Sequence, residues 1–141
     1  MIDQVTVFLV NSAGRLSALT RCIADAQVNM SALTIAETAE FGVVRIVCRD
    51  ASGALSALRA GGFRASSAPV LAVAVPNKPG GLADVLETLD GMNVNIEYGY
   101  CFSVGAERAV DVIKIADAAR ACDAERALER AGFKLLTQEE L

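Results

Sequence analysis

The sequence of 141 residues contains no histidine. Histidine is the commonest general base in enzymes, the usual partner of serine and cysteine nucleophiles, and the commonest metal ligand. The candidate reactive groups that remain are the two tyrosines, Cys101, Glu97 and Asp111, and the last two are expected on different strands. No nucleophile stands out beside a base. We therefore expect a protein that is not an enzyme and that holds no metal ion and no cofactor.

Long apolar runs and clustered basic residues are also missing. No run approaches the roughly 20 apolar residues that span a bilayer, and the first residues lack the basic flank of a signal peptide. The 13 lysines and arginines are scattered and form no basic stripe of the kind that nucleic-acid binding needs. We therefore expect a cytoplasmic protein that binds neither a membrane nor a nucleic acid.

The cysteines are few and widely spaced, with no C-x-x-C pair among them. Zinc sites and redox motifs need ligands or thiols at close spacing. We expect reduced thiols that pack as small hydrophobic side chains, since a disulfide is not expected in a reducing cytosol. These residues are Cys22, Cys48, Cys101 and Cys122.

What the sequence does contain is an internal repeat. An asparagine, a glycine and a leucine recur 66 positions apart, as Asn11, Gly14 and Leu16 and as Asn77, Gly80 and Leu82. The same spacing relates 28–29 to 94–95. Near the end of each half, a Gly-Phe pair recurs 70 positions apart, so the second half carries about four extra residues, placed between 100 and 121. Two domains are therefore expected, at 1–68 and 69–141.

The spacing of 66 also places Arg45 and Asp111 at equivalent positions. A pseudo-twofold axis between the two halves could then bring the guanidinium and the carboxylate close enough to pair. Both side chains could instead face the solvent from their strands. The sequence leaves these two interpretations open.

Each half is predicted to fold as strand, helix, strand, strand, helix, strand. In the first half, strands are expected at 4–10, 30–37, 43–49 and 63–67, with a helix over about 15–27. A second, short helix is expected to end at Gly61-Gly62, and Asp50 and Ser52 can cap its start. Residues 41–42 are expected at a turn. In the second half, strands are expected at 70–76, 95–103, 108–115 and 133–136, with helices from 82 and over 118–131, the latter capped by Asp117.

A unit of this kind forms a four-stranded antiparallel sheet with two helices on one face, which predicts an α+β protein made of two βαββαβ units. The first strand is apolar on both sides, with Val5, Val7 and Leu9 on one side and Phe8 and Val10 on the other. A half-solvated strand would show polar residues on one face. We therefore expect the second face or edge to be covered by the sister repeat or by a second chain.

The turn between the first strand and the first helix is the most informative segment. In the second copy it reads Asn77-Lys78-Pro79-Gly80-Gly81-Leu82. Glycine permits a positive φ or a close approach to the backbone, and the free N–H groups of the first helical turn form an anion site. The turn could bind a carboxylate, or it could serve only to start a helix. In the first copy Ala13 replaces the proline, and Arg15 could pair with a carboxylate or lie exposed.

The second informative segment opens the second strand of each half, at 28–31 (Val-Asn-Met-Ser) and 94–97 (Val-Asn-Ile-Glu). Its asparagine could bind the α-amino and α-carboxylate groups of a ligand, or it could cap the preceding helix or adopt a left-handed conformation. Tyr98, Tyr100 and Cys101 follow in the second copy. They could line a pocket or pack as ordinary strand residues.

These motifs, in this order and in duplicate, resemble the ACT domain family, and in particular short stand-alone proteins built of two ACT repeats. The resemblance covers nearly the whole chain and implies a ferredoxin-like fold for each half, with paired units forming an eight-stranded sheet. It further implies that amino acids bind where two units meet, between the turn of one unit and the strand opening of its neighbour. The residues that it nominates are Asn11, Ala13, Gly14, Arg15, Leu16, Asn29, Met30 and Ser31 in the first repeat, and Asn77, Pro79, Gly80, Gly81, Leu82, Asn95, Ile96 and Glu97 in the second.

The function that we expect from this resemblance is regulatory. A free amino acid would bind at ACT–ACT interfaces and shift the arrangement of a homodimer or of a partner, such as a metabolic enzyme. The alternative is an interaction subunit of an amino-acid-metabolism enzyme or an acyl-CoA ligase, with no ligand of its own. The sequence does not identify the amino acid or the partner.

Overall fold

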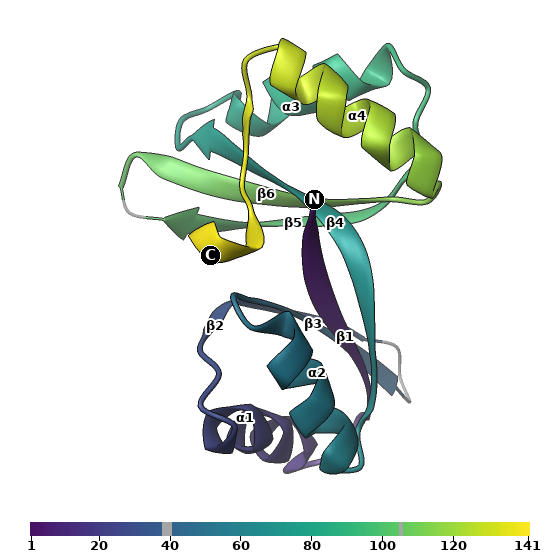
Figure 1. The fold of residues 1–141 in the computed structure, drawn as a ribbon, viewed down its shortest axis with the longest axis vertical. Helices are drawn as coiled ribbons and strands as arrows, with labels where there is room; N and C mark the ends of the chain where they lie inside the picture. Colours follow the sequence, from purple (N-terminus) through teal and green to yellow (C-terminus); the bar gives the residue numbers. More distant parts are fainter. Residues whose placement is uncertain (38–40, 105) are drawn as a thin grey trace. The chain divides into compact units, whose positions relative to one another are not determined.

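The computed structural model describes residues 1–37, 41–104 and 106–141 (Figure 1). The chain divides into two compact units, and each end of the chain joins the unit formed by the other half. The N-terminal unit comprises Asp3–Ala68 and Gln138–Leu141, and the C-terminal unit comprises Met1–Ile2 and Pro69–Thr137. No helix in these described segments is long and apolar enough to cross a lipid bilayer.

The N-terminal unit contains a sheet and two helices. Its elements are β1 (Ile2–Val10), α1 (Arg15–Asp25), β2 (Met30–Glu37), β3 (Phe41–Cys48), α2 (Ala51–Ala60) and the beginning of β4 (Arg64–Pro76). The strand order is β2-β3-β1-β4, and β3 runs antiparallel to both β1 and β2. The short 3-10 helix η1 (Gln138–Glu140) also belongs to this unit.

The C-terminal unit repeats the arrangement. It is built from the end of β4, α3 (Gly81–Asp90), β5 (Ile96–Val104), β6 (Arg108–Ile115), α4 (Ala118–Arg130) and β7 (Lys134–Leu135). The strand order is β5-β6-β4 with β7 paired to β4, and every pair is antiparallel. The prediction of an α+β fold with two βαββαβ repeats is therefore confirmed.

Two local predictions were wrong. The strands expected at 63–67 and 70–76 form one strand, β4, because the fixed φ of Pro69 is compatible with an extended chain. Phe41 and Gly42 were expected at a turn, but they lie in β3. They pair with Val10 and Leu9, the last two residues of β1, so both strands continue to this point.

Each unit buries one face of its sheet under its two helices. In the N-terminal unit, alternate β1 residues such as Val5 and Val7 pack against Leu19 and Ile23 of α1 and Leu58 of α2. In the C-terminal unit, β4 and β6 pack in the same way against α3 and α4 (Figure 1). Asp50 and Asp117 cap α2 and α4 as predicted, each accepting a hydrogen bond from a backbone N–H three residues later.

The other side of β1 carries exposed apolar side chains. Phe8 is 49% exposed and Val10 is 52% exposed. The alternation predicted for this strand is thus present, with one apolar set buried in the core and the other at the surface. That the second set is covered by another unit or chain stays a prediction.

The strand register corrects the alignment of the two repeats. Val7 pairs with Val44, and its counterpart Val73 pairs with Asp111. The equivalent of Asp111 is therefore Val44, and the spacing has become 67 in this strand. Arg45 pairs with Thr6 on the face away from the core, so the premise that Arg45 and Asp111 are equivalent was wrong. The remaining extra residues lengthen α4, which has 13 residues against 10 in α2.

This register buries a carboxylate in the C-terminal unit. Asp111 is 3% exposed and is flanked across the sheet by Val73 and Cys101. Within 1–37, 41–104 and 106–141, its Oδ2 has no hydrogen-bond partner. Burial raises the pKa of this carboxyl group above its ordinary value of 3.8, because removal from water disfavours the charged form.

Replacing Asp111 by valine, the residue at the equivalent position in the first repeat, should stabilise the protein at neutral pH. We expect a gain of about 1–3 kcal/mol in the free energy of unfolding, the usual cost of an unsatisfied buried polar group. Because the folded-state pKa lies above the unfolded one, the folded wild type binds more protons, and its stability falls as the pH rises from about 4 through the folded-state pKa. Urea unfolding of both proteins between pH 4 and 8 measures this, and a gap between them that narrows as the pH rises would contradict it.

The cysteines should differ sharply in reactivity. Burial, assisted by the negative charge of Asp50, raises the pKa of the Cys48 thiol to about 11, whereas Cys101 is exposed. Only the thiolate reacts, so at pH 8 we expect iodoacetamide to label Cys101 at least about a hundredfold faster than Cys48 in the folded protein. Peptide mapping by mass spectrometry gives the two rates, and urea-unfolded protein, in which they should become similar, is the control. Equal labelling in the folded state would contradict the placement of Cys48.

Candidate functional site

The two helix-starting turns have the same backbone conformation. Gly14 and Gly80 are the N-cap residues of α1 and α3, with φ of 83° and 95°. Both lie in the left-handed region that favours glycine, as the sequence predicted. In the described parts of the chain no side chain caps either helix. The first helical turns therefore keep N–H groups that could donate hydrogen bonds to a bound anion.

The first turn borders a cavity of about 240 Å³. Asn11, Ser12 and Leu16 contribute to its wall, together with Leu9, Val10, Ile35, Gly42 and Val44. Ala13 and Gly14 are exposed beside it. The Arg15 guanidinium lies 5.1 Å from the centre of the Phe63 ring, so this arginine makes a cation–π contact.

The second turn is occupied by contacts within its own unit. The Asn77 side-chain amide donates to the carbonyl of Ala106, at 3.3 Å, and the Asn77 backbone N–H donates to the carbonyl of Glu107. A Cβ on Gly81 would lie 2.6 Å from the carbonyl oxygen of Pro76, so only glycine fits there. Asn77 thus holds the turn against the β5–β6 hairpin, and Gly81 lets the turn pack closely against the end of β4. Pro79 and Gly80 are exposed, and Leu82 faces a different cavity.

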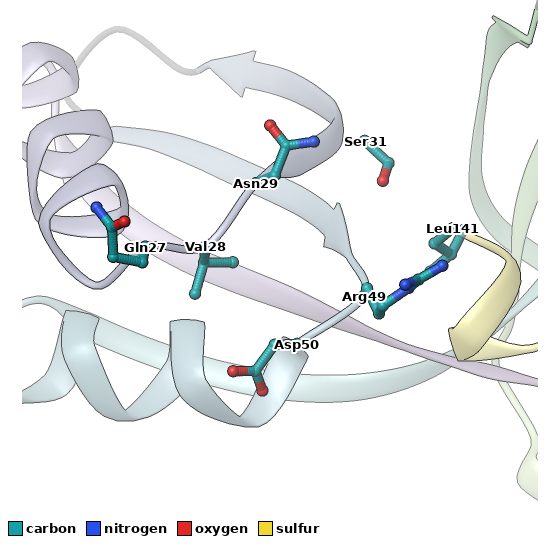
Figure 2. Close-up of a pocket in the computed structure, with 7 residues that line it drawn as sticks. All are labelled: Gln27, Val28, Asn29, Ser31, Arg49, Asp50 and Leu141. Carbon is teal, nitrogen blue, oxygen red and sulfur yellow. The ribbon is translucent and has the colours of Figure 1, made fainter.

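The opening of β2 lies beside a polar cavity of about 360 Å³ (Figure 2). Its wall contains the predicted residues Asn29 and Ser31, along with Gln27, Val28, Arg49, Asp50 and Leu141. An arginine, an aspartate, an amide and a hydroxyl are groups that bind the two charged ends of an amino acid.

Arg49 and Asp50 were not predicted as members of this site. Figure 2 shows Arg49 reaching toward the C-terminal residues, where its guanidinium donates to the carbonyl of Glu139 at 2.6 Å. Asp50 Oδ1 accepts hydrogen bonds from the Gly53 N–H at 2.8 Å and the Ser52 hydroxyl at 3.1 Å. The sequence predicted Asp50 only as a helix cap, and it gave no signal that η1 would lie next to Arg49.

Gln138 holds η1 in the N-terminal unit. Its side-chain amide donates to the carbonyl of Cys48 at 2.6 Å, and its Oε1 accepts a hydrogen bond from the Asp3 N–H at 2.7 Å. The C-terminal residues thereby complete a cavity whose other walls come from the opposite end of the sequence. No local pattern in the sequence predicts this contact.

Both strand openings contain an irregularity at equivalent positions. The register shifts between Met30 and Ala32 in β2, and between Ile96 and Tyr98 in β5. Ser31 and Glu97 therefore sit at β-bulges, which re-aim side chains at the edges of sheets. Met30 packs partly against the core, and the carbonyl of Asn95 accepts a hydrogen bond from Ala116.

The left-handed residues that follow α1 and α3 are Gln27 and Asn93, with φ of 58° and 51°. They lie two positions before Asn29 and Asn95. The left-handed interpretation of the two asparagines was therefore wrong, because the left-handed residue after each helix comes two positions earlier. Asn29 is exposed and free to contribute its amide to the cavity wall.

The turn and the strand opening of one unit lie at opposite ends of its sheet. β1 and β2 both pair antiparallel with β3, so they run in the same direction. The turn follows the end of β1, and the opening precedes the start of β2. Val10 pairs with Phe41 and Met30 with Cys48, and a strand rises about 3.3 Å per residue, so about 23 Å separates the two groups. One unit cannot bring them together around one amino acid.

The C-terminal unit contains a larger and mostly apolar cavity of about 440 Å³. Leu82 and Ile96, two of the predicted residues, line it with Leu86, Gly99, Tyr100, Cys101, Asp111, Val112 and Ile113. Of the three residues for which the sequence left a pocket wall and strand packing open, Tyr100 and Cys101 line this cavity, whereas Tyr98 is not among its lining residues. Asp111 contributes the one carboxylate among the residues that line this cavity.

A family model for the ACT domain pair matches residues 1–133 of the chain. Among solved structures, protein BT0572 from Bacteroides thetaiotaomicron is 34% identical, with a TM-score of 0.90, over 99% of this chain and 94% of that one. The ligand-free regulatory subunit of aspartate kinase from Thermus thermophilus is 18% identical, with a TM-score of 0.65, over 92% and 91% of the two chains. The corresponding subunit from Thermus flavus is also 18% identical, with a TM-score of 0.61 and 92% of each chain covered.

A search of curated proteins found no match. The two aspartate kinase subunits are too distant in sequence to show more than a shared fold. The family model, in contrast, spans both repeats, and the relative from Bacteroides matches over nearly its whole length. With its two βαββαβ units and its paired glycine turns, this chain belongs to the ACT domain pair family.

Proposed function

We propose that this protein is a non-catalytic regulatory protein that binds a free amino acid. The observation that carries the proposal is the polar cavity at the opening of β2 (Figure 2). Arg49 offers a guanidinium for the carboxylate of the ligand, and Asp50 offers a carboxylate for the ammonium group of the ligand. Asn29 adds an amide that can serve either group. The cavity is within the usual size range of small-molecule sites.

The helix-starting turn supplies the second half of the proposed site. Asn11 and Leu16 line a cavity next to Gly14, where uncapped N–H groups favour an anion. Because the turn and the strand opening lie at opposite ends of one sheet, a ligand that touches both must sit between two units. We therefore propose that the site forms where ACT units meet, within the chain or between the chains of a homodimer.

Binding between units gives a regulatory mechanism. An amino acid that contacts two units favours the arrangement in which both contacts are made, and it shifts the equilibrium only by its difference in affinity between arrangements. A partner protein would detect that shift. Two solved structures of this fold are regulatory subunits of aspartate kinase, which supports a regulatory role and an enzyme of amino-acid metabolism as the partner.

The proposal predicts that at least one of the twenty amino acids binds the purified protein. Isothermal titration calorimetry at millimolar ligand should give a saturable heat, and the same ligand should raise the melting temperature, because it binds only the folded state. Absence of both effects for all twenty would contradict the proposal.

The Arg49→Gln variant tests the proposed site. It removes the guanidinium that would bind the carboxylate, so we expect affinity to fall about tenfold or more. The matched control is Arg120→Gln, which makes the same charge change on the exposed surface of α4. An equal loss in both variants would point to net charge and not to the cavity.

The second candidate function is an interaction subunit with no ligand of its own. The exposed apolar side chains Phe8, Val10 and Phe41 favour it, since they lie together on β1 and β3 and are each about half exposed. Purification from the native host separates the alternatives. Recovery of the homo-oligomer alone would argue against a stable partner.

A further inference from the structure

A cavity in the C-terminal unit combines apolar walls with one buried charge. Leu82 and Leu86 of α3 form one side, and Gly99 and Cys101 of β5 lie on the sheet beside Asp111. Its volume of about 440 Å³ lies within the range of small-molecule sites. This cavity lies within a single ACT unit, so its existence does not depend on how two units meet.

One oxygen of the Asp111 carboxylate is buried without a partner among the described residues. Asp111 is 3% exposed, and in the described segments its Oδ2 has no hydrogen-bond partner. Its neighbours on the sheet are Val73 and Cys101, and α3 faces the cavity with leucines. The titratable side chains that share the cavity wall are Tyr100 and Cys101, and neither carries a positive charge. A buried charge of this kind is costly unless it is paired.

The first repeat provides an internal comparison. The equivalent of Asp111 there is Val44, and the equivalent of Gly99 is Leu33. The cavity that Val44 lines in the N-terminal unit is smaller, at about 240 Å³, and none of the described residues in its wall is charged. At these two positions the second repeat thus has a glycine in place of a leucine and a carboxylate in place of an apolar side chain.

We propose that this cavity is a site for a small organic cation, a primary ammonium group carried on an apolar body. The ammonium would pair with Asp111, and the body would fill the space between the leucines of α3 and Gly99. The ligand needs no carboxylate, which distinguishes it from the amino acid of the proposed function. The site shares Leu82 with the predicted amino-acid residues, but it does not include Arg49.

Cyclohexylamine is a suitable probe, and cyclohexanol is its neutral counterpart of similar shape. In NMR titrations at pH 7, we expect saturable shifts of the amides around Gly99 and Asp111 with the amine, and at least about tenfold weaker binding of the alcohol. The Asp111→Asn variant should weaken amine binding about 30-fold or more, because the ammonium would be left without its counter-ion. The matched control is Asp84→Asn on the exposed surface of α3, which should bind as the wild type does.

A second measurement uses the wild type alone and does not depend on a variant that folds. Cys101 lines the cavity and is exposed, whereas Cys22 and Cys122 do not line it. Cyclohexylamine should slow alkylation of Cys101 and leave the rates of Cys22 and Cys122 unchanged. Cyclohexanol at the same concentration should slow none of the three. Equal effects of amine and alcohol, unchanged affinity in Asp111→Asn, or equal losses in both aspartate variants would overturn the proposal. Arg49→Gln should leave amine binding intact. The experiments can therefore distinguish a failure of the proposed amine site from a failure of the proposed amino-acid site.

Discussion

Antiparallel pairing of β3 with both β1 and β2 is the constraint on which the rest of the account depends. It makes the first two strands of the N-terminal unit run in the same direction. The glycine turn after β1 and the bulged opening of β2 must then lie at opposite ends of the sheet. Under the proposed function each of them would bind part of an amino acid, and a site that uses both has to form between units. The proposal therefore connects ligand binding to the arrangement of units.

The two repeats share one fold but differ in the side chains at their helix-starting turns and third strands. At the helix-starting turn, the first repeat leaves Asn11 beside a cavity, whereas the second ties Asn77 to the β5–β6 hairpin. At the third strand, Val44 packs in the core and also lines the smaller cavity, whereas Asp111 places a carboxylate at the wall of the larger one. The two repeats thus share a fold but differ in the length of the second helix and in these side chains.

Much of this structure could be predicted from the sequence. Periodicity gave the order of elements, and the φ of Gly14 and Gly80 followed from the need for a left-handed residue before each first helix. The aspartate caps followed from their position before apolar helical stretches. These features are local, so a few neighbouring residues determine them.

The rest depended on contacts that the sequence does not encode locally. A spacing of 66 aligned Arg45 with Asp111, and only the strand register showed that one added residue makes Val44 the true equivalent. A shift of one residue moves a strand side chain to the opposite face of the sheet. The spacing of 66 therefore aligned Asp111, which is buried, with a residue on the face away from the core. The approach of Glu139 to Arg49 joins residues 90 positions apart, and no periodicity reveals it.

The measurement that tests the central claim most directly is an amide NMR titration of the whole chain with the amino acid that binds. If one ligand contacts a turn and a strand opening together, the amides of 14–16 and 29–31, or their counterparts in the second repeat, should shift with a single dissociation constant. Shifts at only one of the two groups, or at the two groups with different constants, would contradict a site formed between units.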